Sequence, residues 1–289
     1  MYEAYYGLSE KPFSILPDPD FLFWSRAHSM AFAMMEYGVM NQAGFTVVTG
    51  DVGCGKTTLI RRLLGRIGDS VAVGLVSNTG ESSSDLLRWI LMSLDQPFDA
   101  PTYVSLFKQF QDYLIEEYAR DRHVVLIIDE AQNLNTKALE ELRMLSNINA
   151  EKDQLLQLII VGQPQLRDLL QAPELRQFAQ RVSSDFHLGR LRLSDVTKYI
   201  DHRLNVAGAK SVVFSDEACR LIYQASGGVP RVINILCDTA LIYGFANEAA
   251  SIDAEIVKSV IKDKRDYGVL SFEGDSEFGQ PQRPKLMTS

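Results

Sequence analysis

The 289-residue sequence is 46% hydrophobic and 23% charged, which suits a globular protein with a substantial core. Its net charge of −8 argues against a protein that coats nucleic acid by overall charge, although a local basic patch remains compatible with it. The three cysteines and four histidines show no metal-ligand spacing, and the odd number of cysteines indicates reduced thiols. There is no signal peptide and no apolar run near the roughly 20 residues that span a bilayer, so a cytoplasmic protein is expected.

Residues 1–25 contain several prolines and aromatic side chains, which disfavour a continuous helix. We expect an extended arm anchored by Phe13, Phe21, Phe23 and Trp24. Two roles stay open for it, a packed N-terminal arm or one wall of an adenine pocket. A helix capped by Ser25 should follow over residues 26–42, with its methionines in the core.

The next stretch, FTVVTGDVGCGKTTLIRRLL, predicts a buried strand over Phe45–Thr49, a glycine-rich turn and a helix that begins at Lys56. It matches the phosphate-binding pattern G-x-x-x-x-G-K-[ST] at Gly50, Gly55, Lys56 and Thr57. The glycines let consecutive backbone N–H groups surround a β-phosphate at a helix N-terminus. The Lys56 ammonium reaches the β- and γ-phosphates, and the Thr57 hydroxyl holds Mg²⁺. The pattern predicts nucleoside triphosphate binding.

Further alternation of strands and helices predicts a parallel sheet covered on both faces. Strands are expected over residues 70–78, His123–Ile128, Leu155–Val161 and Ser183–Leu188. Helices are expected after a polar turn at residues 79–84, over Tyr103–Tyr118, over Thr136–Asn149 and in short pieces after Gln163.

Two strand ends carry candidate catalytic groups. Asp129 and Glu130 follow the apolar strand His123–Ile128, at the edge where parallel sheets bind ligands. Asp129 is expected to hold the Mg²⁺ shell, and Glu130 to polarise the attacking water. Gln163, after the next strand, is a candidate contact for the γ-phosphate or that water, with a turn-forming role as the alternative.

From about Leu191 the pattern changes to amphipathic helices over Ser194–Val206, Ser215–Ser226, Pro230–Phe245 and Asp253–Lys262, with Ser194, Ser215 and Asp253 as N-caps. Arg231 lies at a helix start, where the helix dipole disfavours a cation, so it is expected to face an anion. The predicted organisation is an arm (1–25), a P-loop core (26–190), a helical lid (191–265) and a tail (266–289) that is disordered or docks a partner.

With these motifs assembled, the chain resembles an AAA+ ATPase of the ExeA/GspA (general secretion pathway protein A) type, with MshM-like and exopolysaccharide-locus relatives. The resemblance extends from about Tyr2 to Lys262. It is carried by YGLSEKPFSILPDPDFLFWSRAH, GFTVVTGDVGCGKTTLIR, IIDEAQNL, LEELRMLSN, IIVGQPQLRDLL and GGVPRVINILCDTAL.

The resemblance implies a fold with a five-stranded parallel sheet followed by a small all-helical lid, and it implies ATP and Mg²⁺ as cofactors. Glu130 and Asp129 would form Walker B, Gln163 would stand at sensor 1 and Arg231 at sensor 2. An arginine finger that enters the neighbouring subunit's site would be Arg181 or, second, Arg176. Nucleotide contacts are implied for Gly50, Asp51, Val52, Gly53, Cys54, Gly55, Lys56, Thr57, Thr58 and Arg231.

Two departures from the family pattern bear on function. Cys54 stands where hydroxyl residues are common, but only its backbone N–H is needed, so nucleotide binding should survive. The secretion members continue into a transmembrane helix and a peptidoglycan-binding domain, which this sequence does not show. A direct cell-wall role is therefore not expected unless the sequence is a piece of a longer protein, and inner-membrane association would go through a partner.

The leading hypothesis is an ATP-driven switch or assembly factor for secretion, envelope polysaccharide or pilus assembly, acting as a homo-oligomer with a membrane-complex partner. A phosphotransferase fits less well because DEAQ suits water activation, and the intact Glu130 argues against a partner that barely hydrolyses ATP. The alternative is a DNA-associated regulator like the transposition ATPases of the TnsC/TniB type. Overall acidity counts against it, and its basic side chains would be Arg61, Arg62, Arg66, Lys108, Arg120 and Arg122.

Overall fold

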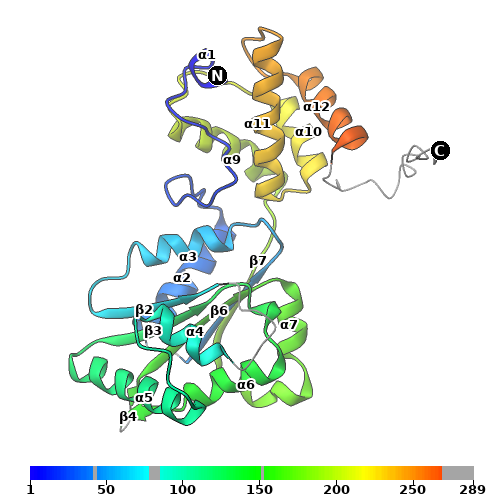
Figure 1. Ribbon diagram of the computed structural model, residues 1–289. Coiled ribbons are helices and arrows are strands. Elements are labelled where there is room, and N and C mark those ends of the chain that lie inside the picture. The colour runs from blue at the N-terminus through cyan, green and yellow to red at the C-terminus, as the bar shows by residue number, and fades with distance from the viewer. Residues whose placement is uncertain (42–43, 78–84, 151–152, 269–289) are drawn as a thin grey trace, which may run out of the picture. The chain divides into compact units, whose positions relative to one another are not determined.

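The computed structural model describes residues 1–41, 44–77, 85–150 and 153–268, and the chain forms two compact units (Figure 1). Residues 26–52 and 56–189 form the core unit. Residues 1–25 and 190–268, together with loop residues 53–55, form the helical unit. The turn predicted at residues 79–84, and residues 269–289 of the predicted tail, lie outside the described residues.

The core unit is built on a five-stranded parallel sheet with the order β2-β3-β6-β1-β7. Its strands are β1 (Phe45–Gly50), β2 (Val71–Val76), β3 (His123–Ile128), β6 (Leu156–Gly162) and β7 (Val182–Leu188). The three central strands are almost continuously buried, whereas the edge strands β2 and β7 alternate between buried and more exposed residues. This is the difference expected between strands covered on two faces and strands at a sheet edge. The predicted fold class is confirmed.

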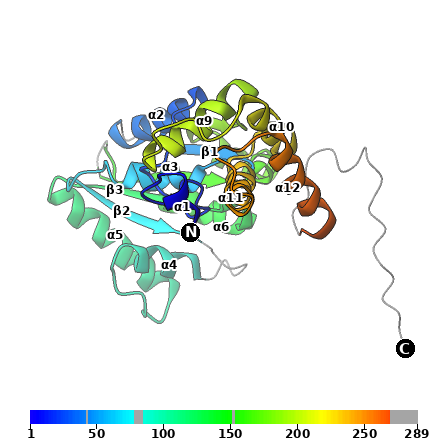
Figure 2. The same cartoon turned by 90° about the horizontal axis from the view of Figure 1, so that it is seen from above.

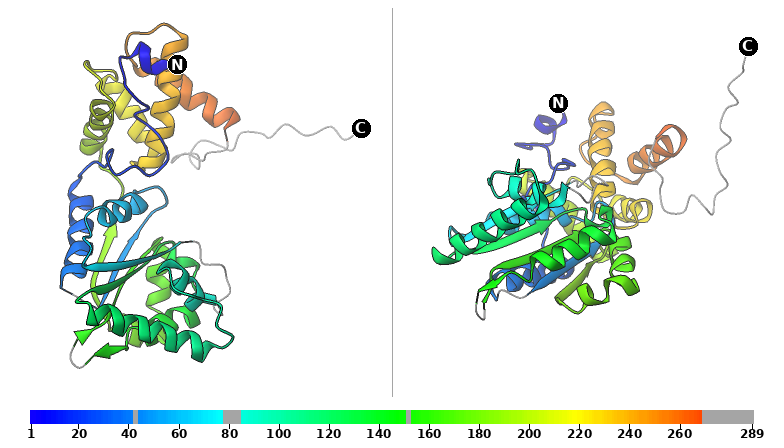
Figure 3. Two further views of the ribbon diagram at one scale, coloured as in Figure 1. Left: turned by 60° about the vertical axis from the view of Figure 1, so that its left-hand side comes forward. Right: turned by 60° about the horizontal axis from the view of Figure 1, so that its bottom comes forward.

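Helices cover both faces of this sheet (Figure 3). The helices are α2 (Arg26–Met40), α3 (Lys56–Leu64), α4 (Leu86–Ser93), α5 (Tyr103–Ala119), α6 (Thr136–Leu145), α7 (Pro164–Leu170) and α8 (Arg176–Ala179), with short turns η2 (Ala131–Asn133) and η3 (Pro173–Leu175). Alternate β3 residues Val124, Leu126 and Ile128 belong to the hydrophobic cluster that includes α4, α5 and α6. Helices α2 and α3 pack on each other and on β1, with their own buried apolar side chains.

The helical unit contains α9 (Leu193–Val206), α10 (Asp216–Ser226), α11 (Pro230–Ala246) and α12 (Ala254–Tyr267). Helices α10, α11 and α12 pack beside one another (Figure 2). The N-terminal arm, with the short helix α1 (Tyr2–Tyr5), contributes Phe13 and Phe21 to the buried core of this unit. Trp24 was expected to be an anchor as well, but it is 41% exposed.

A buried polar cluster fixes the arm on the helices. Arg203 donates hydrogen bonds to the backbone oxygens of Pro12 and Ser14, and its guanidinium lies 4.9 Å from the centre of the Phe21 ring. The Tyr199 hydroxyl donates to Asn234 Oδ1 at 2.7 Å, and Asn234 Nδ2 donates to the Ser14 oxygen at 3.1 Å. Each charged or polar group has a partner within the chain, so the cluster is structural.

Three predicted element boundaries are wrong. The helix expected over Thr136–Asn149 ends at Leu145, and residues 149–150 (β4) pair with residues 153–154 (β5) in a short hairpin. Ser194 is not an N-cap, since α9 begins at Leu193 and no side chain caps it, whereas Ser215 and Asp253 cap α10 and α12 as predicted. Helix α12 continues to Tyr267, five residues beyond Lys262.

Candidate nucleotide-binding and catalytic site

Three central strands bring the predicted catalytic residues to one edge of the sheet. β6 pairs with β3 on one side and with β1 on the other, in parallel registers that place Ile128 opposite Ile160 and Thr49 opposite Gly162. The glycine-rich loop after β1, Asp129 and Glu130 after β3, and Gln163 after β6 therefore leave the same carboxyl edge. Ligands bind at that edge in parallel α/β sheets.

The glycine-rich loop has the backbone that its sequence requires. Gly53 and Gly55 adopt φ values of +79° and +96°, a region that side chains with a Cβ rarely enter. Val52 is exposed and the Cys54 side chain is buried, so a thiol reagent reaches Cys54 only if the loop opens. Thr57 and Thr58 follow in the first turn of α3. This loop therefore has the local geometry of a phosphate-binding turn at a helix start.

Lys56 is only 6% exposed, and its ammonium lies across the loop. Its Nζ donates to the backbone oxygens of Gly50, at 2.7 Å, and of Asp51, at 3.0 Å. Its positive charge also favours the ionised form of the two carboxylates after β3, an effect that by itself would lower the pKa of each. A buried ammonium held over a glycine turn is the group that would bind phosphate oxygens.

Thr57 and Asp129 meet as a hydroxyl–carboxylate pair. The Thr57 hydroxyl donates to Asp129 Oδ2 at 3.0 Å, and the N–H of Glu130 donates to Asp129 Oδ1 at 2.9 Å. Burial raises the pKa of Asp129, and it outweighs the hydrogen bonds and the Lys56 charge, which lower it. The groups around Asp129 therefore do not fully offset the cost of burying its negative charge. A divalent cation bound beside the carboxylate would supply the missing positive charge.

These oxygens fit Mg²⁺. Among the described residues, no group of three His, Cys, Asp or Glu side chains is placed to hold a metal. Mg²⁺ commonly keeps waters and substrate phosphates and needs only one or two protein oxygens. Thr57 and Asp129 supply those two.

Glu130 occupies a different environment one residue along. Its backbone has φ +55°, the left-handed region that costs a residue with a Cβ roughly 1–2 kcal/mol and that occurs often at functional sites. Its Oε2 accepts from Gln132 Nε2 at 2.6 Å and from Gln163 Nε2 at 3.2 Å. Burial raises the pKa of Glu130, but these two hydrogen bonds and the charge of Lys56 together lower it by more, so the net shift of the pKa is downward. The carboxylate thus stays ionised, as a proton acceptor must.

Of the three predicted arginines, Arg231 contacts the glycine-rich loop through its backbone: its N–H donates to the Gly53 oxygen at 3.2 Å, and a Cβ at Gly53 would lie 2.6 Å from Arg231 Cβ. Arg231 is exposed in the first turn of α11, in the helical unit. Arg181 precedes β7, and its guanidinium donates to Ser146 Oγ at 2.9 Å and to Asn147 Oδ1. Arg176 is exposed at the start of α8. Their roles toward nucleotide stay predictions.

Two contributors to the site were not predicted. Gln132 connects Glu130 to Gln163, and Gly162 leaves the room for it, since a Cβ there would lie 3.0 Å from Gln132 Oε1. The letters of DEAQ show that a glutamine is present. Its partners depend on the strand order, which the letters do not specify.

Comparison with known proteins agrees with this architecture. Residues 39–170 match the family described as AAA domain. The structure of Cdc6p from Pyrobaculum aerophilum matches with a TM-score of 0.64 at 18% identity, over 90% of this chain and 70% of that chain. The Thermotoga maritima RuvB Holliday junction branch migration motor matches with a TM-score of 0.56 at 18% identity, over 89% and 76% of the two chains. At such identities the likeness shows the fold alone.

The chain is therefore an AAA domain protein with the α/β P-loop AAA fold. It is homologous to general secretion pathway protein A of Aeromonas hydrophila, with 38% identity over 272 residues that make up 93% of this chain. This confirms the resemblance seen in the sequence. The chain spans about half of that relative, 50% of its length.

Proposed function

We propose that this chain binds and hydrolyses ATP with Mg²⁺, and that it acts as a switch or assembly factor in secretion or in envelope polysaccharide or pilus assembly. The observation that carries the proposal is the contrast between Asp129 and Glu130. One carboxylate is buried beside the Thr57 hydroxyl, and the next is held ionised by two amides. Two adjacent carboxylates in different environments suit a metal ligand and a base.

Each residue then has a distinct task. Lys56 binds the β- and γ-phosphates, and the backbone N–H groups of the glycine turn surround the β-phosphate. Thr57 Oγ1 and Asp129 hold Mg²⁺, which neutralises charge on the phosphate oxygens when it is bound. Glu130 orients a water and accepts its proton, and Gln163 contacts the γ-phosphate or that water. Arg231 would report the γ-phosphate to the helical unit.

Secretion or envelope assembly is proposed through the relative's printed name, general secretion pathway protein A. We further propose a homo-oligomer, in which an arginine of one subunit completes the neighbour's site, and a membrane-complex protein as partner. Among the described residues, no helix combines the length and hydrophobicity needed to cross a bilayer. Any membrane contact of this part of the chain would then go through that partner.

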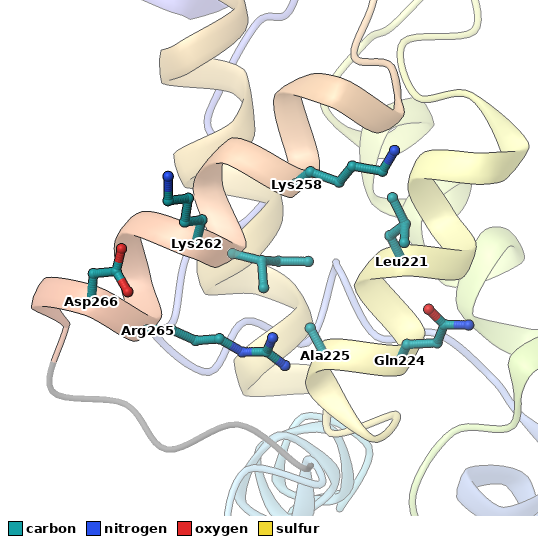
Figure 4. A pocket seen from close by; sticks show the side chains of 8 residues that line it. Leu221, Gln224, Ala225, Lys258, Lys262, Arg265 and Asp266 are labelled. Atoms are coloured by element: carbon teal, nitrogen blue, oxygen red, sulfur yellow. The ribbon is translucent and has the colours of Figure 1, made fainter. Parts of the chain in front are cut away.

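A DNA-associated regulator is the second candidate function. It is supported by a groove between α10 and α12, where Lys258, Lys262 and Arg265 of α12 line up and Arg265 extends toward α10 (Figure 4). Lys258 pairs with Glu255, and Asp266 also lines the groove, which reduces its positive charge. The basic side chains named from the sequence are largely paired as well: Arg66 with Glu36, Lys108 with Asp112, and Arg120 and Arg122 with Glu117. These pairs favour the ATPase switch over the DNA regulator.

Steady-state ATP hydrolysis, with and without double-stranded DNA, tests both functions when Glu130→Gln serves as the blank. If the chain is an ATPase, we expect the turnover of Glu130→Gln to be lower than that of wild type by at least about a hundredfold, the usual contribution of a general base. Stimulation by DNA that declines steeply with salt would transfer support to the DNA regulator. Turnover no higher than the blank under every condition would contradict the hydrolytic proposal.

A further inference from the structure

Gln132 lies in the turn η2, two residues after Glu130, and its side-chain amide connects two strand ends. Its Nε2 donates to Glu130 Oε2 at 2.6 Å, and its Oε1 accepts from the backbone N–H of Gln163 at 2.9 Å. Glu130 follows β3, and Gln163 follows β6. One side chain therefore joins the carboxylate and the amide residue that are proposed to act on the attacking water.

The chemistry of both partners fixes the orientation of this amide. An ionised carboxylate only accepts hydrogen bonds, and a backbone N–H only donates. Turning the amide over would place its oxygen against Glu130 Oε2 and its NH₂ group against the N–H of Gln163. Both contacts would then be lost, so the two hydrogen bonds specify the same orientation.

The end of β6 is shaped to admit this side chain. A Cβ at Gly162 would lie 3.0 Å from Gln132 Oε1 and 2.7 Å from Leu166 Cδ2. The glycine therefore allows Gln132 to approach the backbone of β6 closely enough to accept from Gln163. The link between Glu130 and Gln163 through Gln132 therefore also depends on the glycine at position 162.

We propose that Gln132 is a positioning residue for hydrolysis, whose amide holds the Glu130 carboxylate and the Gln163 main chain in a fixed relation at the sheet edge. The inference rests on the proposed ATPase function. Gln163 Nε2 donates to the same Glu130 Oε2 at 3.2 Å. If that amide turns toward a phosphate when ATP binds, Gln132 still holds the carboxylate.

Two substitutions separate the functions of the amide. Gln132→Met keeps the length of the side chain and removes both hydrogen bonds. Gln132→Glu keeps an acceptor for the Gln163 N–H but places a second carboxylate beside Glu130. We expect kcat to fall about tenfold in Gln132→Met, with the KM for ATP within about twofold of wild type, because misplacing a catalytic group lowers the rate of the chemical step. The control Gln177→Met, at an exposed glutamine on α8, should behave as wild type.

A measurement that does not depend on turnover makes the test complete. In nucleotide-free protein, the ¹H–¹⁵N signal of the Gln163 backbone amide should move in Gln132→Met, which removes its acceptor, and stay near its wild-type position in Gln132→Glu, which keeps an acceptor. An unmoved Gln163 amide signal, or an unchanged kcat, in folded Gln132→Met would overturn the role of Gln132. Wild-type turnover equal to that of Glu130→Gln, together with a moved Gln163 amide signal in Gln132→Met, would reject hydrolysis and leave the connection between Gln132 and Gln163 supported.

Discussion

The chain contains two clusters of buried polar groups, which differ in how fully their charges and hydrogen bonds are satisfied within the chain. Beneath the N-terminal arm, Arg203 binds backbone oxygens and aromatic rings, and Tyr199 and Asn234 complete one another's hydrogen bonds. At the edge of the core sheet, burial leaves the charge of Asp129 incompletely compensated, and the Lys56 ammonium donates to the neutral backbone oxygens of Gly50 and Asp51. Polar groups that satisfy one another build structure, whereas groups with remaining charge suit a ligand.

Substitution of Lys56 tests the ligand side of this comparison most strongly. Lys56→Ala should weaken binding of a fluorescent ATP analogue by about a thousandfold, since two charge-assisted hydrogen bonds to phosphates together contribute about 4 kcal/mol. The free energy of unfolding without nucleotide should change much less. Lys108→Ala, an exposed lysine paired with Asp112, is the matched control. Equal affinities of the two variants would show that Lys56 does not bind nucleotide.

Arg203 tests the structural side. Arg203→Ala should lower the free energy of unfolding by about 3 kcal/mol in urea, because it removes charge-assisted hydrogen bonds and a cation–π contact and leaves buried carbonyl oxygens unsatisfied. The free energy of unfolding of Arg203→Lys should lie between those of wild type and Arg203→Ala, since an ammonium cannot reproduce the two-pronged hydrogen bonding of the guanidinium.

The control for Arg203 is Arg220→Ala, whose side chain is 58% exposed and pairs with Glu217. An exposed pair of this kind should cost at most about 1 kcal/mol. If Arg203→Ala were no more destabilising than this control, the arm would not depend on the buried cluster.

The arginines before β7 offer a comparison within the core unit. Arg181 is already bound to Ser146 and Asn147, whereas Arg176 is exposed on α8, so we propose Arg176 as the arginine that acts on a neighbouring subunit. Arg176→Ala should lower kcat about a thousandfold, the low end of what an arginine finger contributes, with nucleotide affinity unchanged. Arg181→Ala should mainly lower stability, by about 1–2 kcal/mol. The opposite pattern, with turnover sensitive to Arg181 and not to Arg176, would restore the order expected from the sequence.

The nucleotide motif was predictable because its chemistry depends on local order in the chain. Glycines with left-handed backbone, a lysine and a threonine at a helix start are encoded within eight residues, and Asp129 and Glu130 follow a strand whose apolar run is unmistakable. The five strands were predicted with boundaries within two residues. The three central strands read as continuous apolar segments, as buried parallel strands do, whereas the edge strand β7 alternates.

The features that escaped prediction depend on long-range contacts. Gln132 acquires its role from Gln163, 31 residues away, and Arg203 from Pro12, 191 residues away. Neither separation leaves a periodic pattern in the sequence. Trp24 was predicted to anchor the arm because it is aromatic, yet it is 41% exposed. Helix α6 stops at Leu145, where the chain turns into the hairpin of β4 and β5.

Substitution of Asp129 has the smallest expected effect on stability and is the most diagnostic, because the same change should raise the melting temperature without nucleotide and abolish ATP hydrolysis. The pKa of Asp129 is raised by burial, so its charged form is disfavoured in the folded chain. Because the pKa of Asp129 is higher in the folded chain than its ordinary value of 3.8, the protonated carboxyl favours the folded state. This contribution to the free energy of unfolding is complete below pH 3.8 and is lost as the pH rises through the pKa of the folded chain. At pH 7 without nucleotide, Asp129→Asn should therefore raise the melting temperature by about 2 °C, and the difference should shrink as the pH falls toward 3.8.

Mg²⁺ and ATP should reverse that order. A cation bound beside the Asp129 carboxylate supplies the missing compensation, so wild type should gain more thermal stability from Mg²⁺–ATP than Asp129→Asn, which should also lose hydrolysis. Asp112→Asn, which neutralises an exposed carboxylate paired with Lys108, should raise neither stability nor activity. If Asp129→Asn melted below wild type without nucleotide, the hydrogen bonds from Thr57 and the Glu130 N–H would outweigh the cost of burial. Asp129 would then belong with Arg203, as a group whose partners in the chain suffice.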